Sequence, residues 1–205
     1  MFKIIVFVSG RGSNFKAIYS QIEAGIIKAE ILGVVSNNKS CKAIDFAKEK
    51  KIKTYLLGDK SQGNEFWDFD QLAKIFQKEN IDLIVLAGFL KKISEAFVNK
   101  FKQKIINIHP ALLPSFGGKG MYGSHVHKAV FEAACKVSGA TIHFVDEVYD
   151  NGIIIAQEAV DISDVASPEE IAEKVLKIEH NLLPKVVKKF VENKIIIIKN
   201  RVIVI

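Results

Sequence analysis

The segment KIINIHPALLPSFGGKG, residues 104–120, places two polar side chains in an otherwise apolar strand. Asn107 and His109 alternate with isoleucines, so on a strand both would project from the same face. Pro110 keeps His109 extended at the carboxyl end of the strand, where ligands bind in open α/β sheets. An amide can donate to a developing oxyanion and an imidazole can move a proton, so the pair suits attack on a carbonyl group. The plainer alternative is a polar pair whose hydrogen bonds are made by loop backbone.

The segment HFVDEVYDNG, residues 143–152, offers carboxylates near a second strand end. A carboxylate beside His109 would orient the ring and raise its pKa, which would make it a better acid near neutral pH. Spacing alone does not choose between Asp146 and Asp150, and acidic residues at such positions are commonly turn residues. Asp146 stands where a carboxylate caps the following turn, whereas Gly152 lets the chain fold back after Asp150. We therefore expect Asp150 to serve His109.

The segment VSGRGSN, residues 8–14, is typical of a strand that ends in a glycine loop and opens a helix. Free backbone N–H groups at such a helix start favour a phosphate, which predicts an anion site at Gly12, Ser13 and Asn14. A dinucleotide site is not indicated, because Phe15 occupies the third glycine position of that fingerprint. The alternative is a tight turn in which Ser13 or Asn14 merely caps the helix.

Composition excludes several classes of protein. The chain has 205 residues, and 29 basic against 23 acidic residues give a formal net charge of +6, with the lysines dispersed rather than clustered. We expect solvated surface lysines, and the alternative is a surface that favours anionic small substrates. Neither nucleic acid binding nor a membrane span is expected. Cys41 and Cys135 lack metal-ligand spacing and a disulfide pattern, which predicts a cytoplasmic protein. His125 and His127 give only a weak zinc signal, so no metal is expected.

Strand-like and helical patterns alternate along most of the chain, which predicts an α/β fold with a mostly parallel sheet flanked by helices. An Asp-Asn-Gly turn at 150–152 predicts an antiparallel hairpin after the 140–146 strand. Ser167 with Pro168 and Glu170 predicts a capped helix that Pro184 kinks or ends. The expected strands are 3–9, 30–36, 81–87, 104–109, 140–146, 153–160 and two in 194–205; helices are expected after 13, over 40–50 with Ser40 as cap, over 69–76 and over 126–134.

Four segments together resemble the glycinamide ribonucleotide formyltransferases of purine synthesis: VFVSGRGSN, IVLAGFLKKIS, NIHPALLPSFGGKGMYGSHVHKAV and GATIHFVDEVYDNGIIIAQEAV. The resemblance covers residues 1 to about 190. It implies a Rossmann-like formyltransferase fold in one domain, residues 1–205, with a phosphate-binding half (1–100), a folate and catalytic half (101–192) and a C-terminal hairpin (193–205). It also implies small-molecule substrates, 10-formyltetrahydrofolate as co-substrate, and a monomer or homodimer.

The same resemblance assigns roles to individual residues. The catalytic set is Asn107, His109 and Asp150; the phosphate loop is Gly12, Ser13 and Asn14; Glu179 contacts the ribose; Phe89, Leu90, Lys91, Asp146 and Glu147 line the folate site; and His143 and His125 support the active site. Lys91 stands where an arginine is frequent, and the 116–123 loop FGGKGMYG is longer than in many relatives.

Three rival functions share parts of this pattern. Methionyl-tRNA formyltransferases resemble the chain but carry a further carboxyl-terminal domain. Formyltetrahydrofolate hydrolases resemble it too, but carry an amino-terminal regulatory domain and lack GRGSN. A nucleotide-binding module without catalysis would explain the phosphate loop and leave the spacing of Asn107 and His109 without a purpose.

Overall fold

The structure is a computed structural model that describes residues 1–59, 61, 63 and 65–205. The chain forms two compact units, Met1–Ile106 and Asn107–Ile205. The single domain expected over residues 1–205 stays a prediction.

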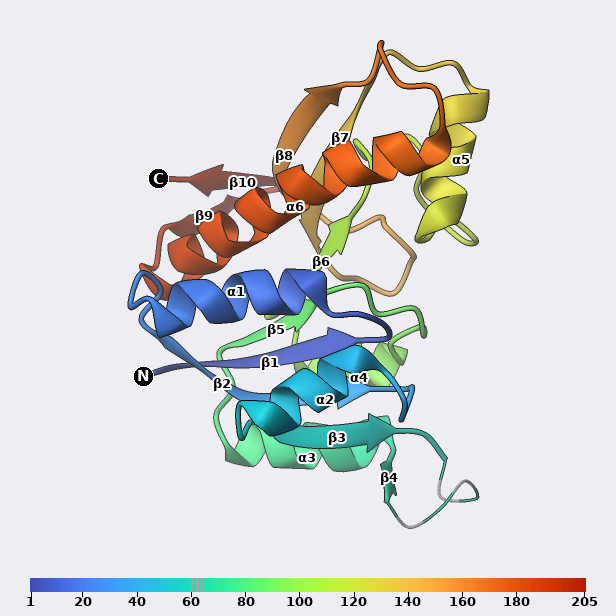
Figure 1. Ribbon diagram of the computed structural model, residues 1–205. Helices are drawn as coiled ribbons and strands as arrows, with labels where there is room; N and C mark the ends of the chain where they lie inside the picture. The colour runs from blue at the N-terminus through green and yellow to red at the C-terminus, as the bar shows by residue number, and fades with distance from the viewer. Residues whose placement is uncertain (60, 62, 64) are drawn as a thin grey trace. The chain divides into compact units, whose positions relative to one another are not determined.

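The first unit is built on a parallel sheet (Figure 1). Its strands follow the order β4-β3-β2-β1-β5, and β6 (Ile105–His109) comes next and crosses the boundary between the units. Continuous apolar runs form the central strands because helices cover both faces of the sheet. The strands are β1 (Phe2–Val8), β2 (Ala29–Ser36), β3 (Lys53–Leu57), β4 (Phe66–Trp67) and β5 (Leu83–Leu86).

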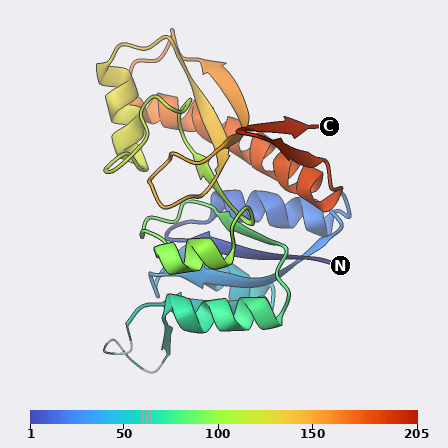
Figure 2. The ribbon, with the colours of Figure 1, turned by 180° about the vertical axis from the view of Figure 1, so that it is seen from behind.

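Four helices cover this sheet, two on each face. Helices α1 (Ser13–Glu23) and α2 (Lys42–Glu49) lie on one face, and α3 (Phe69–Lys78) and α4 (Glu95–Lys100) lie on the other (Figures 1 and 2). The parallel topology brings the carboxyl ends of the strands to one edge, where the loop after β1 begins. The expected mostly parallel α/β fold is confirmed.

Two local expectations for the first unit need correction. The N-cap of α2 is Cys41 and makes no side-chain capping bond, so the prediction that Ser40 caps this helix is wrong. Strands β3 and β4 were not expected, because KTYLL is short and carries a polar start, and Phe66–Trp67 has only two residues. Such short strands give too few residues for a periodic pattern.

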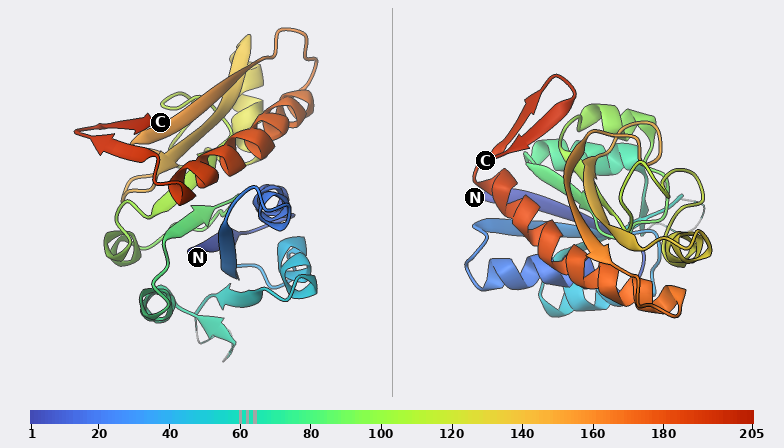
Figure 3. Two further views of the ribbon diagram at one scale, coloured as in Figure 1. Left: turned by 90° about the vertical axis from the view of Figure 1, so that its left-hand side faces the viewer. Right: turned by 90° about the horizontal axis from the view of Figure 1, so that it is seen from above.

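The second unit has the end of β6 followed by β7 (Val137–Phe144) and β8 (Ile154–Asp161), which pair antiparallel as the Asp-Asn-Gly turn predicted. Helix α6 (Pro168–Val191) packs on both strands and on α5 (Ser124–Glu132). The antiparallel pair β9 (Ile195–Ile198) and β10 (Arg201–Val204) lies beside β8 (Figure 3). Both antiparallel predictions are therefore confirmed.

Helix α6 departs from its predicted form at two points. Ser167 caps the helix by accepting from Glu170 N, but the Glu170 carboxylate accepts from Ala166 N rather than completing the box at Ser167. The helix does not end at Pro184 but continues to Val191, because Pro184 and its apolar neighbours are buried, and that burial offsets the missing N–H. The alternative of a kink at Pro184 stays a prediction. Within the described residues, no helix combines the length and the apolar character needed to cross a membrane.

Candidate active site

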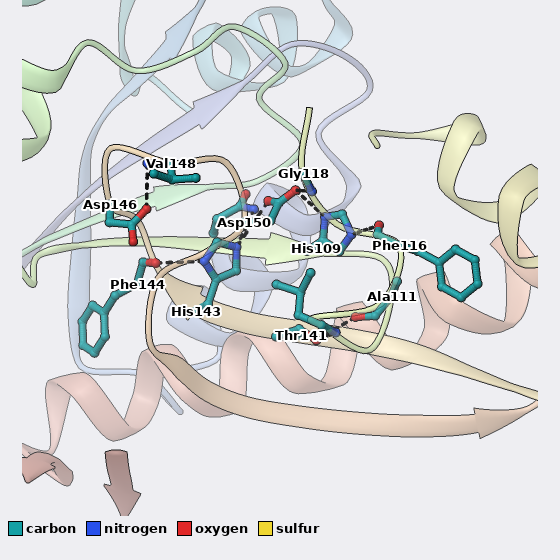
Figure 4. A network of polar contacts seen from close by, with 12 residues as sticks. His109, Ala111, Phe116, Gly118, Thr141, His143, Phe144, Asp146, Val148 and Asp150 are labelled. Carbon is teal, nitrogen blue, oxygen red and sulfur yellow. Dashed lines mark hydrogen bonds and ion pairs between the residues drawn. The ribbon is translucent and has the colours of Figure 1, made fainter. Parts of the chain in front are cut away.

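His109 ends β6 and is almost completely buried, with 3% of its surface exposed. Its Nε2 lies 2.8 Å from the carbonyl oxygen of Phe116, which can only accept, so Nε2 carries a proton in this contact. Its Nδ1 lies 3.6 Å from Oδ2 of Asp150 (Figure 4). Both ring nitrogens therefore face acceptors, an arrangement that a protonated ring satisfies fully.

Asp150 stands between two histidines in the connection from β7 to β8 (Figure 4). Its Oδ2 faces His109 and also accepts a hydrogen bond of 2.9 Å from Gly118 N, while its Oδ1 lies 3.6 Å from Nε2 of His143. The backbone of Asp150 is left-handed, with φ 54°, a conformation that a short polar side chain tolerates better than most. The geometry brings Asp150 to His109, as expected.

Asn107 joins the same cluster from β6. Its Nδ2 lies 3.1 Å from Nε2 of His143, and Nδ1 of His143 donates to the carbonyl of Phe144 at 2.8 Å. The register of β7 against β8 is irregular between Ile142 and His143, and such a bulge commonly re-aims a side chain. The structure thus brings together Asn107, His109, Asp150 and the predicted supporting residue His143.

The pKa of His109 is shifted downward overall, although a neighbouring carboxylate alone would shift it upward. Burial lowers the pKa of His109 below its ordinary value, and the Asp150 carboxylate and the Phe116 carbonyl, which act in the opposite direction, do not reverse it. Asp150 does raise the pKa of His109, as expected of a neighbouring carboxylate, but the desolvation of a nearly buried ring outweighs this effect at 3.6 Å. Burial alone would raise the pKa of Asp150, but its contacts with His143, His109 and Gly118 N lower it overall, which favours the carboxylate.

The loop after β6 contacts both His109 and Asp150 through backbone groups. Phe116 contributes its carbonyl to His109, and Gly118 contributes its N–H to Asp150. Between them, Gly117 leaves no room for a side chain, since a Cβ there would lie 3.2 Å from Asp150 Cβ and would overlap the side chain of Leu113. Sequence reasoning missed these contacts, because backbone groups have no side-chain pattern; the paired glycines were the only signal.

Thr141 fixes the chain segment that leaves His109. Its buried hydroxyl donates to the carbonyl of Ala111 at 2.6 Å and accepts from Leu113 N at 3.0 Å. Gln157 on β8 donates to both Thr141 Oγ1 and the Leu113 carbonyl. Strands β7 and β8 thereby hold the start of the loop that carries Phe116.

The predicted phosphate loop lies in the first unit, at the start of α1. Gly12 is the N-cap, with φ 71°, and a Cβ there would lie 2.6 Å from Cβ of Ala43, so only glycine fits. Gly12 has no side chain with which to cap the helix, and the first turn holds no acidic residue. The N-cap is Gly12 rather than Ser13 or Asn14, and backbone amides at a helix start suit an anion.

The structure also shows the surroundings of the remaining residues named from the sequence. His125 stacks on Tyr122, with ring centroids 4.9 Å apart, whereas His127 is buried on α5. Asp146 accepts from Val148 N and from Asn151 Nδ2, as expected of a residue that caps the following turn. The predicted folate and ribose residues are placed as follows: Phe89 packs on Phe7, Leu90 and Lys91 are exposed in the first unit, Glu147 is exposed, and Glu179 is buried on α6.

No metal centre is apparent in the part of the chain that the structure describes. Among residues 1–59, 61, 63 and 65–205, no three or more His, Cys, Asp and Glu side chains are grouped to hold a metal ion. The acid–base groups of the cluster are those of the two histidines and Asp150, with Asn107 as an amide donor. That set can stabilise an oxyanion and move a proton.

Comparisons with known proteins agree with this chemistry. The sequence model of the family described as "Formyl transferase" matches residues 2–187. The phosphoribosylglycinamide formyltransferase of Bacillus subtilis is 35% identical over 92% of this chain and 94% of its own length. The chloroplastic enzyme of that name from Arabidopsis thaliana is 42% identical over 94% of this chain, which spans 66% of that relative's length. The crystal structure of glycinamide ribonucleotide transformylase 1 from Symbiobacterium toebii superposes with a TM-score of 0.89 at 29% identity, covering 100% and 94% of the two chains.

Proposed function

Because the chain belongs to the formyl transferase family, we propose that it transfers the formyl group of 10-formyltetrahydrofolate to the amine of glycinamide ribonucleotide. One observation carries the proposal: Asn107, His109 and Asp150 converge in the second unit, each oriented by a specific partner. An amide donor, an imidazole and a carboxylate at one point suit acyl transfer between two small molecules. The names of the relatives supply the ribonucleotide acceptor, and the family resemblance supplies the folate donor.

The reaction needs two proton movements and one oxyanion. The amine nitrogen attacks the formyl carbon and forms the new C–N bond, while the carbonyl oxygen becomes an oxyanion. Asn107 donates an N–H to this oxyanion, and His109 donates its Nε2–H, since an anionic acceptor forms a stronger bond than the Phe116 carbonyl. The bond to the folate nitrogen then breaks, the amine loses one proton and the folate nitrogen gains one.

Asp150 supports both steps. Its carboxylate favours the protonated form of His109 as negative charge develops on the substrate oxygen, which offsets part of the burial cost of that charge. It also suits a role as acceptor of the amine proton, passed to the leaving folate nitrogen through water. A fixed carboxylate at this position stabilises the charge-separated intermediate.

The binding roles inferred from the family resemblance are part of the proposal. The substrate phosphate binds the amides of Gly12, Ser13 and Asn14, at a helix start where the N-cap residue is a glycine. The ribose contacts Glu179. The folate contacts are Phe89, Leu90, Lys91, Asp146 and Glu147.

We also infer that the protein acts in the cytoplasm as a monomer or homodimer, without nucleic acid. Cys41 and Cys135 are free thiols, as a reducing compartment favours. The lysines are dispersed along the chain rather than gathered in a basic run. Light scattering of the purified protein, with and without added RNA, measures both the assembly state and any nucleic acid complex.

Turnover of 10-formyltetrahydrofolate, measured with and without glycinamide ribonucleotide, tests the function. We expect formylated ribonucleotide to form, detected by mass spectrometry, and little folate turnover without the amine. Release of formate without the ribonucleotide would indicate a hydrolase instead, and binding of the ribonucleotide without turnover would indicate a nucleotide-binding module. The Asn107→Ala variant is the control for a contaminating activity.

A further inference from the structure

His143 has a hydrogen-bond partner on each ring nitrogen, and the two partners together define its state. The carbonyl of Phe144 can only accept, so Nδ1, at 2.8 Å, carries a proton. In the neutral ring, Nε2 then presents a lone pair. The group that lies 3.1 Å from this lone pair is the side-chain amide of Asn107.

The lone pair of His143 determines which way round the Asn107 amide lies. An asparagine amide has an NH₂ group with two donors on one side and an acceptor oxygen on the other. Only the NH₂ side can satisfy a lone pair, and a rotated amide would set its oxygen against Nε2, two acceptors facing each other. The nitrogen of Asn107 is therefore held at His143 with one N–H, and the second N–H has no hydrogen-bond partner among the residues that the structure describes.

We propose that His143 is a positioning residue that fixes the amide orientation of Asn107, so that the second N–H of Asn107 donates to the formyl oxyanion. The inference rests on the proposed function and deepens it. The carbonyl of Phe144 determines the tautomer of His143, and this tautomer determines the orientation of the Asn107 side-chain amide. A reversed amide would present its oxygen in place of a donor, and an acceptor cannot stabilise an oxyanion.

The Asp150 carboxylate faces the ring of His143, and His109 lies beyond it. Oδ1 of Asp150 lies 3.6 Å from Nε2 of His143, and His109 lies on the other side of that carboxylate. A second proton on His143 would give Nε2–H to Asp150 and remove the acceptor that Asn107 needs. Asp150 and Asn107 therefore compete for Nε2 of His143, and the Asn107 amide, at 3.1 Å, lies closer to it than Oδ1 of Asp150, at 3.6 Å.

A pair of substitutions separates this role from simple packing. His143→Gln keeps an acceptor oxygen at about the reach of Nε2, whereas His143→Leu has a similar volume and no acceptor. We expect His143→Leu to lower kcat on the order of 10²-fold, as the loss of one oxyanion donor does, and His143→Gln to keep most of the turnover. Equal kcat values for the two variants would overturn the proposal.

A double-mutant cycle tests whether His143 acts through Asn107. If it does, His143→Leu should cost little further kcat in a chain that already carries Asn107→Ala, because the amide that it orients is gone. If the fold-loss of kcat in the double variant equals the product of the fold-losses in the two single variants, the proposal is overturned. His180→Leu is a matched control, since its buried Nε2 bonds to no described residue and it has no role in the cluster.

A measurement without activity keeps the inference separate from the proposed function. NMR of the wild-type protein should show His143 neutral with its proton on Nδ1, and the Asn107 NH₂ signals should move in His143→Leu but stay in place in His180→Leu. A proton on Nε2 of neutral His143 would overturn the inference even in an active enzyme. A wild-type chain with no formyl transfer would overturn the function and leave this hydrogen-bond assignment standing.

Discussion

Replacing Gly117 by alanine tests whether the backbone of residues 116–118 holds the catalytic pair. Gly117 is not in the left-handed region, so alanine can adopt its backbone conformation without strain. The added Cβ would instead overlap Leu113, a core residue with 5% exposure, and lie 3.2 Å from Asp150 Cβ. The perturbation is therefore a steric one, aimed at Asp150.

The structure sets the size of the expected effect. Relief of the overlap requires the loop to move away from Asp150 by a few tenths of an ångström or more, which stretches the bonds of 2.9 Å from Gly118 N and 2.8 Å to Phe116 O. Overpacking of this kind costs about 1–3 kcal/mol, or roughly 2–4 °C of melting temperature per kcal/mol for a chain of this length. Because a displacement of about 1 Å costs on the order of 10²-fold in rate, a shift of a few tenths of an ångström should lower kcat roughly up to tenfold.

The assay compares Gly117→Ala with Gly120→Ala. Gly120 has φ 91° and open space where a Cβ would lie, so alanine there is strained at about 1–2 kcal/mol but touches neither His109 nor Asp150. We expect similar melting temperatures for the two variants, measured by circular dichroism, with a loss of kcat only in Gly117→Ala. Wild-type kcat in Gly117→Ala, or equal losses in both variants, would refute the positioning role of this loop.

Three further outcomes are expected. Asp150→Asn should lower the pKa of His109 further and largely abolish turnover, because it removes the charge that opposes the effect of burial. Asp146→Asn should have smaller effects on both quantities, and a larger effect of Asp146→Asn in NMR titration and in kcat would contradict this prediction. Gly12→Ala should raise KM for the ribonucleotide and leave KM for folate near the wild-type value, and an unchanged KM for the ribonucleotide would remove the phosphate site from this loop. Burial lowers the pKa of His109 and His127, so the unfolded chain binds more protons below about pH 6.5, and the melting temperature should fall from pH 7 to pH 5 rather than stay constant.

Most of the fold could be predicted because its strands and helices carry long apolar patterns. The buried run before Gly10 and the turn at Asp150 define β1 and the β7–β8 pair from local sequence alone. Strand β3 could not be predicted in this way, since five residues next to a parallel neighbour owe their conformation to the sheet. The continuation of α6 through Pro184 likewise depends on buried tertiary contacts that local propensity does not contain.

The candidate site divides along the same line. Asn107 and His109 could be proposed because their side-chain types and spacing indicate the chemistry, whereas the choice of Asp150 over Asp146 depended on the Asp-Asn-Gly turn and on the family resemblance. The contact of the Phe116 carbonyl with His109 could not be predicted from the sequence, and neither could the direction of the overall pKa shift of His109. That direction depends on how deeply the ring is buried, which follows from the packing of the whole unit.

The kcat of His109→Ala at saturating concentrations of both substrates tests the central claim most directly. If Asn107, His109 and Asp150 stabilise the oxyanion of formyl transfer, kcat should fall on the order of 10²-fold or more while both KM values change little, because the interaction strengthens only as the oxyanion forms. Circular dichroism of the variant confirms that the chain is folded. A folded His109→Ala protein with near-wild-type kcat would contradict the assignment of formyl transfer to this cluster.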